Sequence, residues 1–441
     1  MSARSTTPTK SAKKGAAFVG VTVLGVVLAA CSSHPAPSAG GGGPAPTVAA
    51  NVKLVNAENI SCPAEVTASC VTVGNIATIS GIVPGLFEGA SVGTDAYMSY
   101  LDSTKGGIDG RKIRLIADDD KFNGDLNSSE TQSMIGKVIS FVGSFSLEDQ
   151  DGGVVLSHNP DVPNVSLSLS QYTLDLSNTI SPLPAIGGWQ LGPLEWFKAH
   201  YPNAVKHVGL LIAQEASAEA QATGLEAAMR HLGFDIVYTS QFGPLQSNFQ
   251  TELLAMQHAG VQYLDLTLMD ATDAEHILTE IHSQGYRPQV IESSGPIYVD
   301  NFVQESGGAA NADGIYLDQT VSLYLGGDAK SIPEVNTFLS WVQKVHPGFT
   351  PDLFTLYGWI SGMLWAEGME HAGSSPTSSS LLTALRQIHS FDAGGLVADS
   401  DPGGRQPPSC WLLARIQNGV FVRVPPSPKS GFICNAPYYK A

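Results

Sequence analysis

The chain has 441 residues, of which 43% are hydrophobic and 14% are charged. This length and composition predict a globular protein with two or three units. The first thirty residues hold four basic residues and no acidic one, so the rest of the chain has 19 basic and 40 acidic residues, a net charge of −21. A body this acidic is repelled by nucleic acid and by anionic lipid headgroups, which excludes nucleic acid as a partner.

The chain begins with a segment typical of exported proteins. Four basic residues precede the apolar run at 16–30, which is shorter than the ~20 apolar residues that a membrane-spanning helix needs. This pattern predicts a signal peptide over residues 1–30. The junction Leu28-Ala29-Ala30-Cys31 is similar to the lipobox of bacterial lipoproteins, and this resemblance implies acylation of Cys31. The alternative is an ordinary cleavage site followed by an unmodified cysteine.

A linker follows Cys31. Residues 31–50 are rich in Pro, Gly, Ser and Ala and carry no formal charge, a composition that packs no core. We therefore expect residues 31–70 to be a lipidated tether with a cysteine-containing lead-in. The tether would hold an extracytoplasmic body at the bacterial cell membrane without spanning it.

Four cysteines remain after Cys31, and an even number in an exported chain predicts disulfides. Three pairings exist, of which Cys62–Cys70 and Cys410–Cys434 are favoured because each closes a short loop beside an expected strand. A zinc site is the alternative, although the spacing C-x-x-C is absent.

From Val71 onward, apolar strand-like runs alternate with amphipathic helix-like runs such as 219–233 and 273–285. This alternation predicts parallel sheets covered by helices on both faces. One sheet of about nine strands would be wide, so two α/β lobes are expected. The expected strands are 75–83, 112–117, 138–143, 164–169, 207–213, 235–242, 263–268, 288–293 and 314–320.

Several segments match one family in chain order. The most specific is Gly106-Gly107-Ile108-Asp109-Gly110-Arg111-Lys112-Ile113, a tight turn followed at once by a strand. From Thr78 to Val424 the chain resembles the type I periplasmic binding proteins of the branched-chain amino acid class, the substrate receptors of bacterial ABC importers. The further matching segments are 141–146, 163–170, 229–237 and 401–424.

The resemblance implies two doubly wound Rossmann-like lobes joined by a hinge. The expected division is 71–190 plus 319–392 for lobe one, and 191–318 plus 393–441 for lobe two. It also implies a binding protein rather than an enzyme, with no cofactor or metal. The implied partners are a small solute and permease subunits with a separate ATPase, because the chain has no phosphate-binding G-x-x-x-x-G-K-[ST] loop.

The resemblance also implies site residues. In lobe one, serine hydroxyls and backbone N–H groups of two loops hold the solute's carboxylate, and the matching positions are Ser144, Ser146, Ser168 and Ser170. The alternative for each serine is a helix cap or a turn hydroxyl.

In lobe two, an acid meets the solute's ammonium group. Glu292 lies near that position, and Asp270 ends another strand on the same face. The alternative for both is a solvated loop carboxylate. Trp189, near the expected crossing between lobes, stacks on the solute or else packs in the core.

The chain departs from the family at two places. Glu148 and Asp149 follow Ser146 where the family has neutral residues, and these acids would repel a carboxylate. In lobe two, 214–224 lacks the tyrosine–glycine pair that reaches the solute in the family. An amide, polyol, sugar or other small polar solute therefore fits as well as an amino acid.

Two motifs suggest other chemistry. Gly89-Ala90-Ser91-Val92-Gly93 spells the G-x-S-x-G of serine hydrolases, but PGLFEG separates it from the preceding strand, so Ser91 is expected in the first turn of a helix. Its glycines would let backbone approach a solute or let the helix pack on the sheet. Residues 119–130 nearly fit a calcium loop, with Lys121 at a ligand position; the alternative is a loop whose acids face water and cap a helix.

Three functions follow from these patterns. The first is a lipid-anchored solute receptor for an ABC importer. The second is a ligand sensor of the same fold that signals to a membrane partner, and the third is a secreted hydrolase that uses Ser91.

Overall fold

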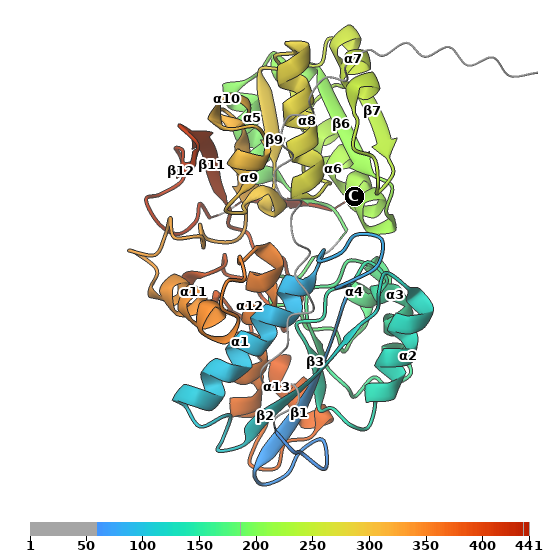
Figure 1. Cartoon of the computed structure of the whole chain (residues 1–441), viewed down its shortest axis with the longest axis vertical. Coiled ribbons are helices and arrows are strands. Elements are labelled where there is room, and N and C mark those ends of the chain that lie inside the picture. Colours follow the sequence, from blue (N-terminus) through green and yellow to red (C-terminus); the bar gives the residue numbers. More distant parts are fainter. Residues whose placement is uncertain (1–59, 186, 435, 441) are drawn as a thin grey trace, which may run out of the picture. The chain divides into compact units, whose positions relative to one another are not determined.

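The computed structural model describes residues 60–185, 187–434 and 436–440. Strands and helices alternate along this part of the chain (Figure 1). The strands are β1 (Cys70–Ala77), β2 (Lys112–Asp119), β3 (Ser140–Val142), β4 (Asn164–Val165), β5 (Trp189–Gln190), β6 (Val208–Ala213), β7 (Ile236–Phe242), β8 (Tyr263–Asp265), β9 (Val290–Ser293), β10 (Tyr316–Gln319), β11 (Leu412–Gln417), β12 (Val420–Arg423) and β13 (Tyr438–Tyr439). The α-helices are α1 (Glu88–Thr104), α2 (Gly124–Met134), α3 (Asp149–Ser157), α4 (Gln171–Asp175), α5 (Leu191–His200), α6 (Ala216–His231), α7 (Gln250–Ala259), α8 (Ala271–Gln284), α9 (Phe302–Glu305), α10 (Ala309–Ala312), α11 (Pro333–Val345), α12 (Leu353–His371) and α13 (Ser378–Leu385). Short 3-10 turns lie at η1 (Ala204–Lys206), η2 (Gly295–Ile297) and η3 (Ala393–Gly395).

The strands form two main sheets. The first has the order β2-β1-β3-β4 and is parallel throughout. The second has the order β12-β11-β10-β9-β8-β6-β7. Its strands β6, β7, β8, β9 and β10 are parallel to one another, and β11 pairs antiparallel with both β10 and β12. This confirms the predicted α/β class with parallel sheets.

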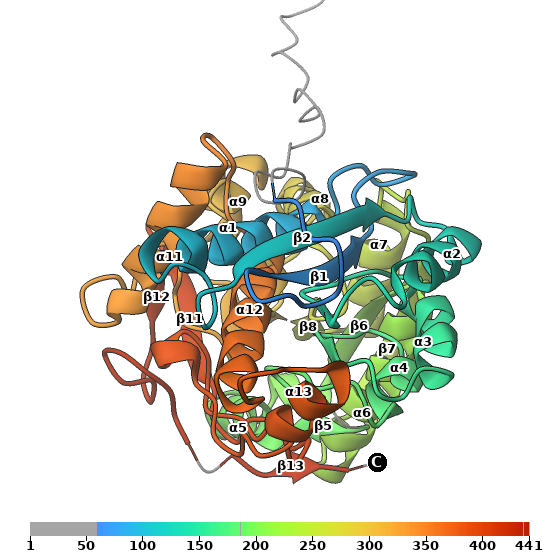
Figure 2. The same cartoon turned by 90° about the horizontal axis from the view of Figure 1, so that it is seen from below.

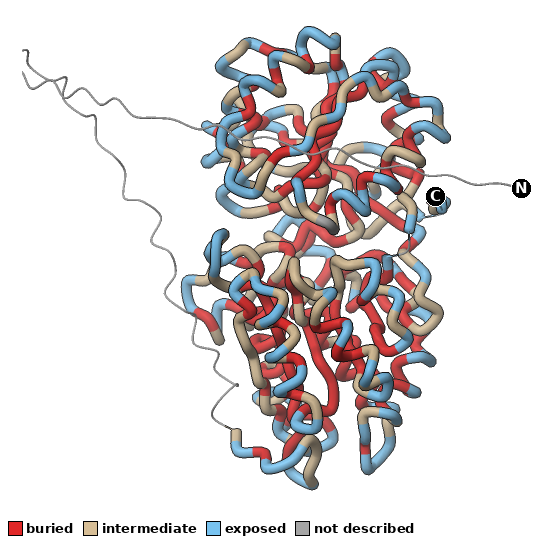
Figure 3. The backbone as a smooth tube through the Cα atoms, turned by 90° about the vertical axis from the view of Figure 1, so that its right-hand side faces the viewer, coloured by how far each residue is buried: buried red, intermediate tan, exposed pale blue. Residues whose placement is uncertain are grey.

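Helices cover the first sheet on both sides. Helices α1, α11 and α12 lie on one side, and α2 and α3 lie on the other (Figure 2). All eight residues of β1 are buried, as expected for a strand covered on both faces. The tube view shows buried residues in the interior of the protein and exposed residues at its periphery (Figure 3).

Element bounds differ from the predicted ones mostly at the ends of strands. The predicted strand 75–83 is β1, which begins at Cys70 and already ends at Ala77. The predicted strand 164–169 shrinks to the two residues of β4, because the chain then turns and Ser170 caps α4. Helix α8 ends at Gly285, whose φ of +67° supplies the expected left-handed cap.

The segment between β10 and β11 returns to the first sheet. Its helix α12 packs along α1, and the Ser378 hydroxyl at the start of α13 donates to the Ile139 carbonyl beside β3 at 2.7 Å. These contacts support 319–392 as part of lobe one, and the lobe boundaries remain a proposal.

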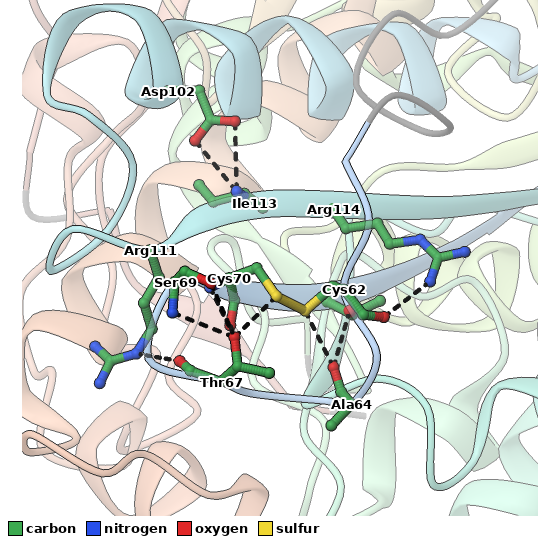
Figure 4. Close-up of a disulfide and its surroundings, with 10 residues drawn as sticks. Cys62, Ala64, Thr67, Ser69, Cys70, Asp102, Arg111, Ile113 and Arg114 are labelled. Carbon is green, nitrogen blue, oxygen red and sulfur yellow. Dashed lines mark hydrogen bonds between the residues drawn. A yellow bond between two sulfur atoms is a disulfide. The ribbon is translucent and has the colours of Figure 1, made fainter.

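The structure contains two disulfides, Cys62–Cys70 and Cys410–Cys434, the pairs favoured by loop length. The first fastens the lead-in to the start of β1 (Figure 4). Around it, the Arg111 guanidinium donates to the Thr67 carbonyl at 3.0 Å, so this bond connects the turn before β2 to the lead-in.

Helices α1 and α12 approach at backbone-contact distance because glycines face each other across the contact. A Cβ atom on Gly93 would lie 1.9 Å from the Thr355 carbonyl oxygen, and one on Gly358 would lie 2.1 Å from the Ala90 carbonyl oxygen. The glycines of G-x-S-x-G therefore serve helix-to-helix packing. The packing partner of these glycines is α12 rather than the expected sheet.

Replacing Gly93 by Ala should lower the free energy of unfolding by about 1–3 kcal/mol or more, because the added methyl group has no room against α12. Urea denaturation followed by circular dichroism measures this change. The control is Gly243→Ala, where the new Cβ would meet nothing nearer than an atom 3.8 Å away. Equal stability of the two variants would contradict the packing role.

Candidate functional site

The carboxyl edge of the first sheet holds a small pocket between the loops that follow β3 and β4, and residues of α2 and α3 also line it. Its cavity volume is about 30 Å³, which holds roughly two water molecules rather than a whole solute. The polar side chains that line it are Asn127, Thr131, Ser144, Ser146, Asp149, Asn164, Ser166, Ser168 and Thr173. A solute that uses this edge therefore lies mainly outside the pocket.

Two of the predicted serines are bonded to the protein itself. The Ser144 hydroxyl accepts from the Ile76 backbone N–H at 3.1 Å. The Ser146 hydroxyl is 3% exposed, donates to Asp120 and accepts from the Glu148 backbone N–H at 2.9 Å. Both hydroxyls thus stabilise the loop after β3.

The other two predicted serines follow β4. The Ser170 hydroxyl accepts from the Thr173 backbone N–H at 3.2 Å and so caps α4. Ser168 lines the pocket and is half-buried. The structure therefore brings all four serines to one edge, and three of them serve as turn or cap hydroxyls.

Asp149 occupies the centre of this edge. Its carboxylate accepts from the backbone N–H groups of Leu169 at 2.7 Å and Ser170 at 3.0 Å. Burial raises the pKa of Asp149 to about 6, while the hydrogen bonds from Ser170 and Leu169 act in the opposite direction. Sequence reasoning noted this acid but missed its partners, because the loop after β3 meets the loop after β4 only in the fold.

Asp119 and Asp120 of the segment 119–130 are bonded within the fold, whereas Asp125 in the first turn of α2 is exposed. Asp120 is fully buried and accepts from the Asn127 side chain at 2.8 Å, and Asp119 accepts from the Ile79 backbone N–H at 3.0 Å. The cap of α2 is Asn123, not an acid. The expectation that the acids face water and cap the helix is therefore met only by the exposure of Asp125, and it was wrong for Asp120 and for the cap. No cluster of metal-binding side chains occurs among the described residues.

An aromatic cluster, made of Phe87, Phe145, Phe354 and Tyr357, lies beside the pocket. The Phe87 ring is 4.7 Å from Phe145 and 4.6 Å from Phe354, centroid to centroid. Phe354 and Tyr357 are half-buried and project from the first turns of α12. Sequence reasoning missed this cluster, although the i, i+3 spacing on α12 is a signal for one face.

Three acids lie side by side on the second sheet. Asp265 ends β8 and pairs in register with Glu292 of β9, and Asp318 follows on β10. Asp265 and Glu292 are each 2% exposed, and each of the three has one buried carboxyl oxygen without a hydrogen-bond partner in the described part of the chain. Glu292, the predicted ammonium ligand, is therefore buried near the carboxyl end of β9.

The pKa values of all three acids are raised above their usual values. Burial raises the pKa of Glu292 well above its usual value, and the neighbouring Asp318 charge and the hydrogen bond between the two carboxyls act in the same direction. Burial raises the pKa of Asp318 to about 7 and that of Asp265 to about 6.

A second acidic group lies where α6 and α8 begin. Asp270 caps α8 by accepting from the Asp273 backbone N–H at 2.9 Å, so it is a helix cap. Burial, followed by the charges of Asp270 and Glu215, raises the pKa of Asp273 to about 8. The carboxyl edge of the second sheet is thus acidic at both its buried and its more open positions.

Trp189 lies in β5, pairs with β13, and packs against the core. It therefore takes the packing alternative. Ser91 is fully buried in the first turn of α1, and its hydroxyl donates to the Asn75 side chain at 2.6 Å. A buried hydroxyl bonded to an amide has no base to activate it.

The Glu292 carboxyl makes stability depend on pH. Because its folded-state pKa is raised, the folded protein binds more protons than the unfolded chain, and the free energy of unfolding falls as pH rises above about 4.5. Glu292→Gln should leave stability at pH 5 nearly unchanged and raise it at pH 8 by about 1 kcal/mol or more. Urea titrations at both pH values measure this.

The matched control is Glu195→Gln on the exposed face of α5, which should change stability equally at both pH values. A Glu292→Gln protein that is less stable than the parent at pH 8 would contradict the assignment.

Comparison with solved structures identifies the fold. The chain is similar to the branched-chain amino acid transporter substrate-binding protein LivJ from Streptococcus pneumoniae in complex with isoleucine, with a TM-score of 0.66 and 16% identity over 83% of this chain and 100% of that one. For a solute-binding protein from R. palustris in complex with 4-hydroxybenzoate, the TM-score is 0.67 and the identity is 15%, over 84% of this chain and 98% of that one. For a fatty acid ABC transporter substrate-binding protein from Thermomonospora curvata, the TM-score is 0.66 and the identity is 15%, over 86% of this chain and 94% of that one.

No curated protein sequence matches the chain. The model of the periplasmic binding protein family matches residues 70–420, which include both main sheets up to the first residue of β12. No helix in the described ranges is long and apolar enough to cross a membrane. The proteins compared are substrate-binding proteins and not enzymes, and the chain belongs to the periplasmic binding protein family, with the type I fold.

Proposed function

We propose that this chain is an extracytoplasmic receptor that captures a small polar solute between its two lobes and delivers it to an ABC importer. The observation that carries the proposal is the family match over residues 70–420, which spans both sheets. Ligands of open α/β sheets bind at the carboxyl ends of the strands, and both edges here carry polar side chains. The ATP-driven step belongs to another chain.

The mechanism is closure of the lobes around the solute. A solute that touches both lobes makes its full set of contacts only in the closed state, so its binding shifts the population toward that state. Closure also creates the surface that permease subunits recognise. No covalent step is involved.

The charge of the two edges favours a neutral or cationic solute. Asp149 and Glu148 lie at the first edge, and Asp270, Asp273 and Glu215 lie at the second. The half-buried rings of the aromatic cluster add an apolar surface, which suits a solute with an apolar part, such as the isoleucine and the 4-hydroxybenzoate of two compared structures. Amides and amines with such a part fit both features.

A lipid on Cys31 would keep the receptor at the membrane. Cys31 and the tether lie outside the described residues, so this part of the proposal rests on the sequence LAAC and on the composition that follows it. A ligand sensor of the same fold is the second candidate, because closure would serve a signalling partner in the same way.

A thermal-shift screen of amino acids, amides, amines, sugars, polyols and organic acids tests the receptor. A solute at about 100 times its Kd stabilises the folded state by about 2.7 kcal/mol, which raises the melting temperature by several degrees. We expect a neutral or cationic solute to raise the melting temperature. A screen without any shift would contradict capture of a small polar solute of these classes.

Phe354→Ala should weaken the apparent affinity for that solute at least tenfold, because the substitution removes a half-buried ring at the proposed solute surface. The matched control is Tyr172→Ala, which removes a ring that is 42% exposed and outside the aromatic cluster. Isothermal titration calorimetry compares the two variants. Equal affinities would place the solute elsewhere.

Expression of the full chain in a bacterial host with an alkyne fatty acid should label the protein, and Cys31→Ser should abolish the label. The same variant should move from the membrane fraction to the soluble exported fraction. Retention of label by Cys31→Ser would overturn the anchor without touching solute binding.

A further inference from the structure

The loops after β3 and β4 are joined by a carboxylate of the chain itself. Asp149 Oδ2 accepts from the Leu169 N–H at 2.7 Å and from the Ser170 N–H at 3.3 Å, while Oδ1 accepts from the Ser170 N–H at 3.0 Å. The Thr173 hydroxyl donates to the Asp149 carbonyl at 2.9 Å and ties the same two loops. The backbone donors at this edge therefore already hold a carboxylate.

Backbone N–H groups beyond the end of a parallel strand have no partner within the sheet, so they take a polar group from elsewhere. A carboxylate that accepts from two of them forms short, charge-assisted hydrogen bonds. The chain supplies that carboxylate from α3, at the place where a solute's carboxylate was expected beside Ser168 and Ser170. The Leu169 and Ser170 N–H groups are therefore already taken by a carboxylate of the chain.

We propose that Asp149 is a specificity-determining residue, whose carboxylate fills the lobe-one carboxylate position and restricts the receptor to solutes without a carboxylate at that end. The inference rests on the proposed receptor function and names the substrate class: neutral or cationic solutes such as amides and amines.

The surroundings reinforce this selection. Glu148 and Asp151 flank Asp149 on α3, and Asp120 reaches the same edge through Ser146. The residues that line the pocket include no Lys, Arg or His. A second carboxylate would thus meet several like charges and no compensating cation, while an ammonium or amide group would meet none of this repulsion.

Chemical rescue tests the site without knowledge of the natural solute. Asp149→Ala leaves two backbone donors without a partner, so the melting temperature should fall by several degrees. Sodium formate at 100 mM should restore most of that loss, because formate is a carboxylate small enough for the vacated position, while sodium chloride at equal concentration should not. The parent protein should respond equally to both salts.

The matched control is Asp151→Ala, which removes the same charge from the same first turn of α3. Formate should raise the melting temperature of Asp151→Ala no more than chloride does. If Asp149→Ala does not fold in chloride, refolding yield in formate against chloride replaces the melting temperature. Rescue by formate in either readout supports the assignment.

Equal effects of formate and chloride on Asp149→Ala, or a formate effect on the parent or on Asp151→Ala, would overturn it. A failed rescue leaves the receptor function standing, since the solute screen is independent of it. If formate rescues Asp149→Ala but no solute shifts the melting temperature in the screen, the proposed receptor function is contradicted and the assignment of Asp149 stands.

Discussion

The close packing of α1 against α12 is the contact on which the first lobe depends. α1 follows directly from β1, whereas α12 arrives after the chain has built most of the second sheet. The helices meet at backbone distance because Gly93 and Gly358 leave no side chain between them. Asp352 caps α12 beside Gly89. Phe354 and Tyr357, in the first turns of α12, therefore lie at the carboxyl edge of the first sheet. The position of the aromatic cluster is therefore set by a glycine contact one turn away.

The architecture could be predicted because its signals are local. The fully buried strand β6 is a continuous apolar run, and α8 shows both its helical spacing and its terminal Gly285 within one short segment. The turn before β2 carries its own glycines with positive φ. Such signals need no knowledge of what lies across the sheet.

The site could be predicted only in part because its interactions are non-local. The serines were placed on the right edge, but whether a hydroxyl is free depends on which backbone N–H comes near it, as with Ser144 and Ile76. Glu292 was named as a ligand, yet the register that sets it beside Asp265 buries it among like charges. Asp149 was recognised as unusual, and only the meeting of two loops shows what it binds.

The C-terminal residues fasten the second sheet's segment to its own beginning. β13 pairs with β5, the Tyr438 hydroxyl donates to the Gly188 carbonyl at 3.1 Å, and the Leu191 N–H at the start of α5 donates to the Pro437 carbonyl at 2.9 Å. Only two residue pairs form this ladder, so it opens more readily than the main sheets. In amide hydrogen exchange, β5 and the first turn of α5 would exchange together with the tail, as one cooperative unit that detaches while the rest of the protein stays folded.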